Sequence, residues 1–413
     1  MKRLLLIFAL YLCACSAIEG EVLVEVTNPS AFARQGEVVE VQWCDVPQCA
    51  AKSDNVVVRN SEGVEIPSQL VFGPQGELQS VLFQADVEAN ASACYAITRG
   101  TRQEYEPKVY GRYVPERMDD YAWENNLTTC RIYGPALKDP QTQGVDVWVK
   151  STSKLIINEW FAKNDYHHNY GEGMDCYKVG NTLGGGALAI VDGEKLHLSG
   201  NYLTQRCTMN GPLRTSAEFE YAVQEVGGKS VSMHRTITLD ADSRFTHQEY
   251  VFDGFDGEIE VAAGVVLHDV KARTDGDNFV AITEATSDTK DPERDGNISL
   301  AVVLEGGNAS ADVDAHAVVT RRVKAGDKIV MLNFEHVDTS SFAGRGVSSD
   351  IDAWDVLYVE SKAVHVRLLE PFHDAFSKFF AEFKAERVSS VIYRNALGDH
   401  RGCVYIFVLV ERS

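Results

Sequence analysis

The sequence predicts an all-β protein, a large antiparallel β-sandwich of the supersandwich kind with a short C-terminal helix. Apolar and polar residues alternate along most of the chain, as in half-buried strands. Gly, Pro, Asn and Asp separate these alternating runs at the spacing typical of sandwiches. No helical period occurs between residues 187 and 336.

The alternating runs predict two sandwich parts, residues 21–112 and residues 113–358. In the first, Val22, Val24 and Val26 share one strand face, and 37–43 forms another strand. The second, main part contains a clear strand at 145–150 and several more after residue 187. Residues 161–187 have no period, so we expect a long loop there, and long loops on β-scaffolds often carry function.

Residues 359–413 are expected to form a C-terminal helix and tail. Phenylalanines recur at helical spacing, with charged residues opposite them: Phe372, Phe376, Phe379, Phe380 and Phe383. We therefore predict a helix docked on the sandwich.

Residues 1–15 predict an export signal. Lys2 and Arg3 precede the short apolar run 4–12. The sequence Leu-Cys-Ala-Cys that ends at Cys15 resembles the lipobox of bacterial lipoproteins, which predicts a lipid anchor on Cys15. An ordinary cleaved signal that ends near Ala17 is the alternative. We expect an exported protein, either an outer-membrane lipoprotein or a periplasmic protein.

The formal net charge of −21 argues against a nucleic-acid partner, because phosphate binding needs clustered Lys and Arg. A local basic pocket still permits an anionic substrate. The sequence contains no zinc spacing, no HExxH motif and no nucleophile elbow. We predict no cofactor and leave a divalent metal open. The oligomeric state also stays open.

The densest set of chemically active side chains lies between residues 165 and 177. It includes histidines, tyrosines and acids in a Gly-punctuated segment: His167, His168, Tyr170, Glu172, Asp175 and Tyr177. These residue types serve general acid–base catalysis. A surface loop with hydrogen-bonded turns is the alternative.

Other candidates are more scattered. Arg117, Asp120 and Trp123 lie in one polar cluster, either as substrate contacts or as the salt-bridged start of a strand with a core Trp. Arg206 and Arg214 flank a Gly-Pro turn, where an Arg could grip a carboxylate or pair with a surface acid. His234 lies on the polar face of a strand, which is either a solvated exterior or a groove wall.

Four stretches resemble an exported bacterial family of unknown function that includes an ulvan-oligosaccharide dehydratase. They are Pro115-Glu116-Arg117 through Asn125, Tyr133-Gly134-Pro135 with 145–148, Tyr166-His167 through Gly180, and Gly211-Pro212-Leu213-Arg214. The resemblance covers roughly residues 21–358. Asn169 stands where we expect the family to favour Asp, and the segment after about Tyr358 departs from the family's usual ending.

The resemblance implies a β-sandwich that removes water from a terminal uronic acid of a polysaccharide-derived oligosaccharide, leaving a 4,5-unsaturated sugar. His167 would be the base, Tyr170 or Tyr177 the acid, and Arg214 or Arg206 the partner of the carboxylate. Substrate contacts and a groove wall would come from the remaining candidates: Arg117, Asp120, Trp123, His168, Glu172, Asp175 and His234. A polysaccharide lyase and a non-catalytic glycan-binding lipoprotein remain as alternatives.

Overall fold

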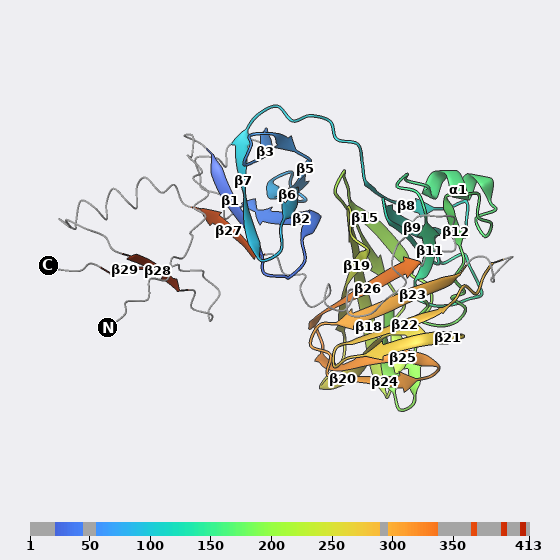
Figure 1. The fold of residues 1–413 in the computed structure, drawn as a ribbon. Coiled ribbons are helices and arrows are strands. Elements are labelled where there is room, and N and C mark those ends of the chain that lie inside the picture. Colours follow the sequence, from blue (N-terminus) through green and yellow to red (C-terminus); the bar gives the residue numbers. More distant parts are fainter. Residues whose placement is uncertain are drawn as a thin grey trace.

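The computed structural model describes residues 21–43, 55–289, 296–337, 365–369, 390–394 and 405–409. Within these residues the chain is built from antiparallel sheets and one short helix, which confirms the predicted all-β sandwich class (Figure 1). Cys15 and the expected C-terminal helix lie outside the described residues. The described part contains no helix that is long and apolar enough to cross a membrane.

The N-terminal sandwich consists of two sheets that bury a shared apolar core. Val24, Val26 and Val58 of one sheet pack with Val81 and Phe83 of the other. The first sheet has the order β27 (His365–Leu369), β1 (Val22–Asn28), β7 (Ala91–Arg99), β3 (Val56–Asn60) and β4 (Glu65–Ile66). The second has the order β2 (Arg34–Gln42), β6 (Leu78–Val87) and β5 (Ser68–Phe72).

The main domain is a larger sandwich in which a nine-stranded sheet packs against two five-stranded sheets. The nine-stranded sheet has the order β15 (Thr204–Asn210), β16 (Arg214–Glu220), β18 (Lys229–Asp240), β19 (Phe245–Asp253), β26 (Lys328–Val337), β23 (Asn297–Leu304), β22 (Phe279–Ala285) and β21 (Val270–Asp275), with β17 (Gln224–Val226) beside β18. One five-stranded sheet has the order β14 (Lys195–His197), β13 (Ala187–Asp192), β20 (Glu258–Val266), β25 (His316–Lys324) and β24 (Ala309–Val313).

The other five-stranded sheet, called the site sheet below, has the order β12 (Gly173–Asp175), β11 (Asp146–Lys150), β10 (Thr128–Ile132), β9 (Asp120–Asn125) and β8 (Val109–Val114). All three sheets of the main domain contribute to one core, in which Phe219 and Ile237 of the nine-stranded sheet join Val261 and Val147. Helix α1 (Ile157–Lys163) lies over the site sheet, and a separate hairpin is formed by β28 (Ser390–Arg394) and β29 (Tyr405–Leu409).

Three sequence-based boundaries need correction. The expected division at residue 112 falls inside β8, which pairs with β9 along its whole length, so the change of domain lies in the connecting segment 100–108. The expected loop 161–187 contains the end of α1 and all of β12. Within the expected tail, β27 pairs with β1 and so extends the N-terminal sheet.

Candidate functional site

The site sheet has two faces of opposite chemistry. Its inner face adds apolar side chains to the main core, including Tyr121, Trp123, Cys130, Ile132, Val147 and Met174. Because side chains alternate along a strand, the intervening residues point to the outer face, and several of them are charged: Asp120, Glu124, Arg131, Asp146, Lys150 and Asp175. A face that carries charge and is nevertheless buried needs a cover and ion pairing.

Helix α1 provides the cover, and a buried glutamate holds it in place. Glu124 accepts hydrogen bonds from the backbone N–H groups of Ile156 and Ile157, each 2.8 Å long. Lys150 Nζ lies 3.0 Å from Glu124 Oε2, and both side chains are fully buried. The carboxylate thus satisfies free N–H groups at the start of a helix that has no side-chain cap of its own.

The centre of the outer face is a network of one arginine and three aspartates. Arg131 Nη2 lies 2.5 Å from Asp146 Oδ2 and 3.2 Å from Asp175 Oδ2, and Arg131 Nε lies 3.8 Å from Asp120 Oδ2. The Arg131 guanidinium also lies 5.0 Å from the Trp148 ring centroid. All three carboxylates are almost completely buried, so one cation faces three acidic groups.

Burial without enough positive charge perturbs these carboxyl groups. It raises the pKa of Asp120 to about 6, against the lowering effect of Arg131. Burial also raises the pKa of Asp146 and, with the charge of Asp146 added, that of Asp175. One carboxylate oxygen of each aspartate has no hydrogen-bond partner among the described residues. Strongly perturbed groups of this kind cluster at functional sites.

The loop between β8 and β9 is strained and holds Arg117 at the edge of this network. Met118 and Asp119 both have positive φ, at 52° and 64°, which costs non-glycine residues free energy. Gly134 permits the conformation, because a Cβ there would lie 1.8 Å from the Asp119 carbonyl oxygen. The Tyr202 hydroxyl also donates a hydrogen bond to that oxygen. Such over-determined strain is typical of functional loops.

Two arginines converge on the hydroxyl of Tyr166. Arg131 Nη1 donates to Tyr166 Oη at 3.2 Å, and Arg117 Nε donates to the same oxygen at 3.3 Å. The Tyr166 ring stacks on Trp148 with centroids 4.8 Å apart. Arg117 keeps 30% of its side chain exposed, and its closest carboxylate contact is at 3.8 Å, to Asp120. Arg117 is therefore the partly accessible cation of the network.

His167 lies beside Tyr166 at the solvent edge. Its Nδ1–H donates to the Asp175 carbonyl oxygen at 3.1 Å, and the Asp288 carboxylate lies 3.9 Å from Nδ1. The side chain is 40% exposed. Its Nε2 has no hydrogen bond to any described residue, so the Nδ1 contact favours the tautomer in which Nε2 carries the lone pair. This arrangement suits a proton acceptor.

The structure therefore brings four of the predicted residues together, namely Arg117, Asp120, His167 and Asp175. The other candidates of the 165–177 segment point elsewhere. Tyr170 is exposed and donates to Asp165, His168 packs on the Tyr170 ring, and Glu172 pairs with Lys154. These three residues lie on the surface and make no contact with the Arg131 network.

Two predicted residues are buried too deeply for the roles expected of them. Trp123 belongs to the inner face of the site sheet and donates to Thr246 Oγ1 at 3.0 Å, so it cannot stack on a sugar. The expected substrate contact is corrected to a core residue. Tyr177 is also in the core, and burial raises the pKa of its hydroxyl further above the usual range. A direct role as the acid does not fit that position.

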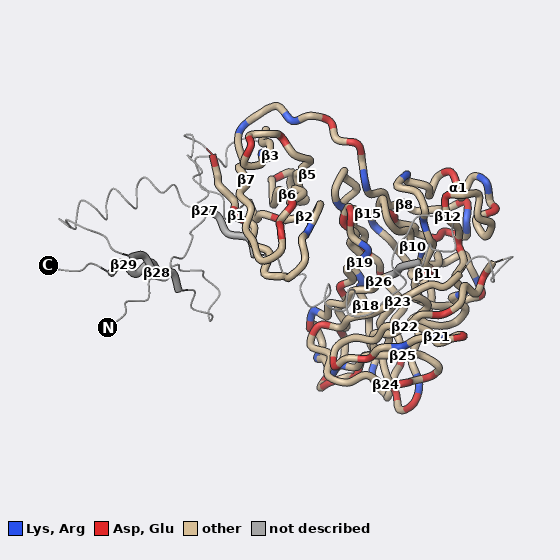
Figure 2. The backbone as a smooth tube through the Cα atoms, viewed as in Figure 1, with Lys and Arg blue, Asp and Glu red and all other residues tan. Residues whose placement is uncertain are grey.

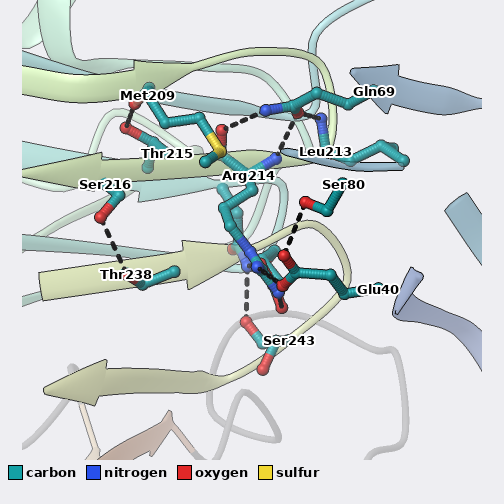
Figure 3. Close-up of polar contacts among 12 residues, drawn as sticks. Glu40, Gln69, Ser80, Met209, Leu213, Arg214, Thr215, Ser216, Thr238 and Ser243 are labelled. Carbon is teal, nitrogen blue, oxygen red and sulfur yellow. Dashed lines mark hydrogen bonds and ion pairs between the residues drawn. The ribbon is translucent and has the colours of Figure 1, made fainter. Parts of the chain in front are cut away.

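The predicted role of Arg214 as a carboxylate-binding residue is also corrected. Its side chain instead joins the two domains. Its guanidinium lies 2.6 Å from Glu40 Oε2 in the N-terminal sandwich and 2.6 Å from Asp240 Oδ1 in the main domain. Gln69 Oε1 accepts from the backbone N–H groups of Leu213 and Arg214, each at 2.9 Å (Figure 3). With its guanidinium occupied in this way, Arg214 is not available to a substrate carboxylate.

Arg206 and His234 are also separate from the network. Arg206 is exposed on β15 and pairs with Glu218. His234 Nδ1 lies 2.8 Å from Glu220 Oε1, on the face of β18 opposite the buried Arg235. For both residues the solvated surface pairing, which the sequence left open, is the arrangement present in the structure.

Sequence reasoning missed Arg131, Asp146 and Tyr166, which form the centre of the network. A signal was available, because Arg131 lies between Cys130 and Ile132 and Asp146 between two valines. A charged residue at every second position of an otherwise apolar strand indicates a buried polar face. No group of three or more His, Cys, Asp or Glu side chains within the described ranges is placed to hold a metal ion.

Comparison with known proteins gives a family match over most of the chain. The model of a domain of unknown function, DUF4861, matches residues 26–330. An uncharacterized protein, P7, from Formosa agariphila is 29% identical over 296 residues, which cover 66% of this chain and 74% of that protein.

Two solved structures from Enterococcus faecalis are also similar, an α-mannosidase (TM-score 0.48, 10% identity) and a protein of glycosyl hydrolase family 38 (TM-score 0.49, 11% identity). Each match covers 86% of this chain, which spans about half the length of either structure, 47% and 48% respectively.

Proposed function

This chain belongs to the DUF4861 family, and we propose that it is a carbohydrate-active hydro-lyase. Its substrate would be an oligosaccharide with a terminal uronic acid, from which it removes water to leave a 4,5-unsaturated sugar. The observation that carries this proposal is the position of His167, whose open Nε2 lies at the edge of a buried charged network that also holds the partly accessible Arg117.

Water elimination from a uronate needs a cation on the carboxylate and a base at C5. Positive charge on the carboxylate makes the C5 hydrogen more acidic, and a neutral imidazole accepts that proton. Arg117 takes the carboxylate role that the sequence predicts for Arg214 or Arg206. A guanidinium with free N–H groups can bind a carboxylate in a bidentate manner. His167 takes the role of the base.

The rest of the network positions these two groups. Tyr166 binds Arg117 through its hydroxyl and packs against His167, with ring centroids 4.9 Å apart. Asp175 accepts the His167 Nδ1–H through its backbone carbonyl. Two of the motifs that resemble the dehydratase-containing family, the one with Arg117 and the one with Tyr166 and His167, thus meet in space, which supports a role for both in one site.

The proposal is tested by incubating the full-length protein with uronate-ended ulvan oligosaccharides. We expect an ultraviolet absorbance from the new conjugated double bond and a product lighter by one water, with no shortening of the chain. Shortened products with the same chromophore would instead identify a polysaccharide lyase. Binding without any product would identify a glycan-binding protein and refute the hydro-lyase proposal.

Variants test the two roles. His167→Gln should lower kcat by about 10²–10⁴ because it removes a general base. The matched control is His168→Gln, which changes the neighbouring histidine outside the network and should keep activity within about threefold of the wild type. Arg117→Lys should mainly raise KM, because Lys cannot reproduce bidentate binding. Near-normal turnover in His167→Gln would contradict the assignment of the base.

We also propose that the protein is exported and anchored by a lipid on Cys15, as its N-terminal sequence predicts. Metabolic labelling of bacterial cells with a clickable fatty acid should label the wild type and not Cys15→Ser. Equal labelling of both proteins would contradict the anchor, and absence of label from both would favour an ordinary cleaved signal.

A further inference from the structure

A second histidine is oriented by a buried carboxylate close to the proposed site. His268 lies in the connection between β20 and β21, and its Nδ1 is 2.7 Å from Glu284 Oε1 of β22. The Glu284 side chain is fully buried, whereas His268 keeps 24% of its side chain exposed. A carboxylate that accepts from Nδ1–H leaves Nε2 of the imidazole free for proton transfer, as in other His–carboxylate pairs.

Two buried polar atoms, one in this pair and one next to it, have no hydrogen-bond partner among the described residues. Glu284 Oε2 and Tyr177 Oη are both buried, and neither has a hydrogen-bond partner in the described part of the chain. The Tyr177 ring makes an edge contact with His268 at a centroid distance of 5.5 Å. Buried polar atoms without partners are rare in folded proteins and call for an explanation such as a bound polar ligand or a catalytic role.

A third histidine nearby, His316, has both ring nitrogens in hydrogen bonds to the backbone. His316 is buried, its Nε2 accepts from the Leu183 N–H at 3.0 Å, and its Nδ1 donates to the Asp314 carbonyl at 2.7 Å. Both of its ring nitrogens are therefore used structurally. Burial also lowers the pKa of His316, which keeps it neutral beside His268. Among the described residues, Glu284, Tyr177 and a neutral His316 lie next to His268.

Short backbone segments connect this pair to His167. His167 bonds to Asp175, and Tyr177, two residues later, contacts His268. The N–H groups of Ser287 and Asp288, just after β22, both donate to the Cys176 carbonyl. Asp288 is also the carboxylate beside His167. The segment Asp175–Tyr177 therefore links the contacts of His167 and His268, with one residue, Cys176, between them.

We propose that His268, oriented by Glu284, is the proton donor to the leaving hydroxyl in the elimination reaction. This inference rests on the proposed function. His167 Nε2 takes the C5 proton, the electron pair of that bond forms the C4–C5 double bond, and the C4–O bond breaks. The Nε2–H of protonated His268 supplies a proton to the departing oxygen, which leaves as water. His167 then loses its proton to solvent, and His268 regains one.

The test compares two substrates that differ in the leaving group. His268→Gln should lower kcat by about 10²–10⁴ on the natural 4-hydroxyl substrate. On the 4-deoxy-4-fluoro analogue, fluoride leaves without a proton, and the same variant should stay within about tenfold of the wild type. His167→Gln should be impaired on both substrates. The surface histidine His197, which is paired with Asp192, provides the matched control as His197→Gln.

Glu284→Gln tests the orienting role. It keeps an acceptor for Nδ1–H and removes the negative charge beside the ring, so activity on the 4-hydroxyl substrate should fall. Activity on the 4-deoxy-4-fluoro substrate, which needs no proton donor, should stay within about tenfold of the wild type. Circular dichroism and thermal unfolding of each variant separate loss of chemistry from loss of fold.

The outcomes are distinct. Equal loss on the hydroxyl and fluoro substrates in a folded His268→Gln variant, or full activity on both, would overturn the role of His268 and leave the hydro-lyase proposal intact. A wild-type protein that eliminates neither water nor fluoride from any uronate would refute both proposals together.

Discussion

Asp120→Asn should stabilise this protein at neutral pH, although it removes a residue of the candidate site. The carboxylate lies in the network of three buried aspartates around Arg131, and the nearest guanidinium nitrogens of Arg117 and Arg131 are both 3.8 Å from its Oδ2. Burial therefore outweighs attraction and raises the pKa to about 6. Asparagine keeps the acceptor for the Gly134 N–H and carries no charge.

The magnitude follows from that pKa. A rise from 3.8 to about 6, at about 1.4 kcal/mol per pKa unit, corresponds to about 3 kcal/mol. The folded state binds the Asp120 proton more tightly than the unfolded state does, so this residue makes stability fall as the pH rises from about 4 to above 6. The variant lacks that loss and should gain about 3 kcal/mol at pH 8, or roughly 6–12 °C in Tm, but little at pH 4.

Urea unfolding of both proteins from pH 4 to pH 8 measures the effect. Asp256→Asn, a change of an exposed aspartate, is the control and should leave the difference from wild type flat across this range. An Asp120→Asn variant that is less stable than the wild type at pH 8, by more than at pH 4, would refute the reasoning, because the carboxylate would then be a net stabilising partner of the arginines.

Two further predictions concern contacts described above. Gly134→Ala should destabilise the protein by about 2–4 kcal/mol in urea unfolding and raise KM, because its Cβ would displace the Asp119 backbone and with it Arg117; unchanged values would show that the loop is not strained. Arg214→Met should cost about 2–3 kcal/mol, because Glu40 and Asp240 lose their shared partner. In a double-mutant cycle, Glu40→Gln should recover part of that cost. Free-energy changes that simply add would contradict an energetic coupling between Glu40 and Arg214.

Local pattern was sufficient to predict the fold class. A strand that buries one face must alternate, and the run through 229–240 does so along its whole length. The division between domains is less accessible, because β8 follows the connecting segment without a composition change and the sequence of its partner β9 resembles a polar cluster more than a strand. The pairing of β27 with β1 joins residues more than three hundred positions apart and leaves no local signal.

The site was predictable only where its residues lie close together in the sequence. His167 and Asp175 were found because they belong to one dense segment, and Arg117 and Asp120 because they belong to another. Arg214 was misplaced because its partner Glu40 lies in the other domain, and spacing along the chain does not reveal that contact. Acids are spread over both domains, so overall charge gave no guide to the site either (Figure 2).

The pairing of β27 with β1 also sets the order in which the chain can finish folding. During synthesis β1 emerges first, and its partner at His365–Leu369 follows about 340 residues later, roughly 20–70 s at ordinary elongation rates. Until then β1, with the sequence VLVEVTN, is an open strand edge of the kind that recruits other chains. Nascent or truncated chains that end before residue 365 should therefore depend on chaperones more than the complete protein does.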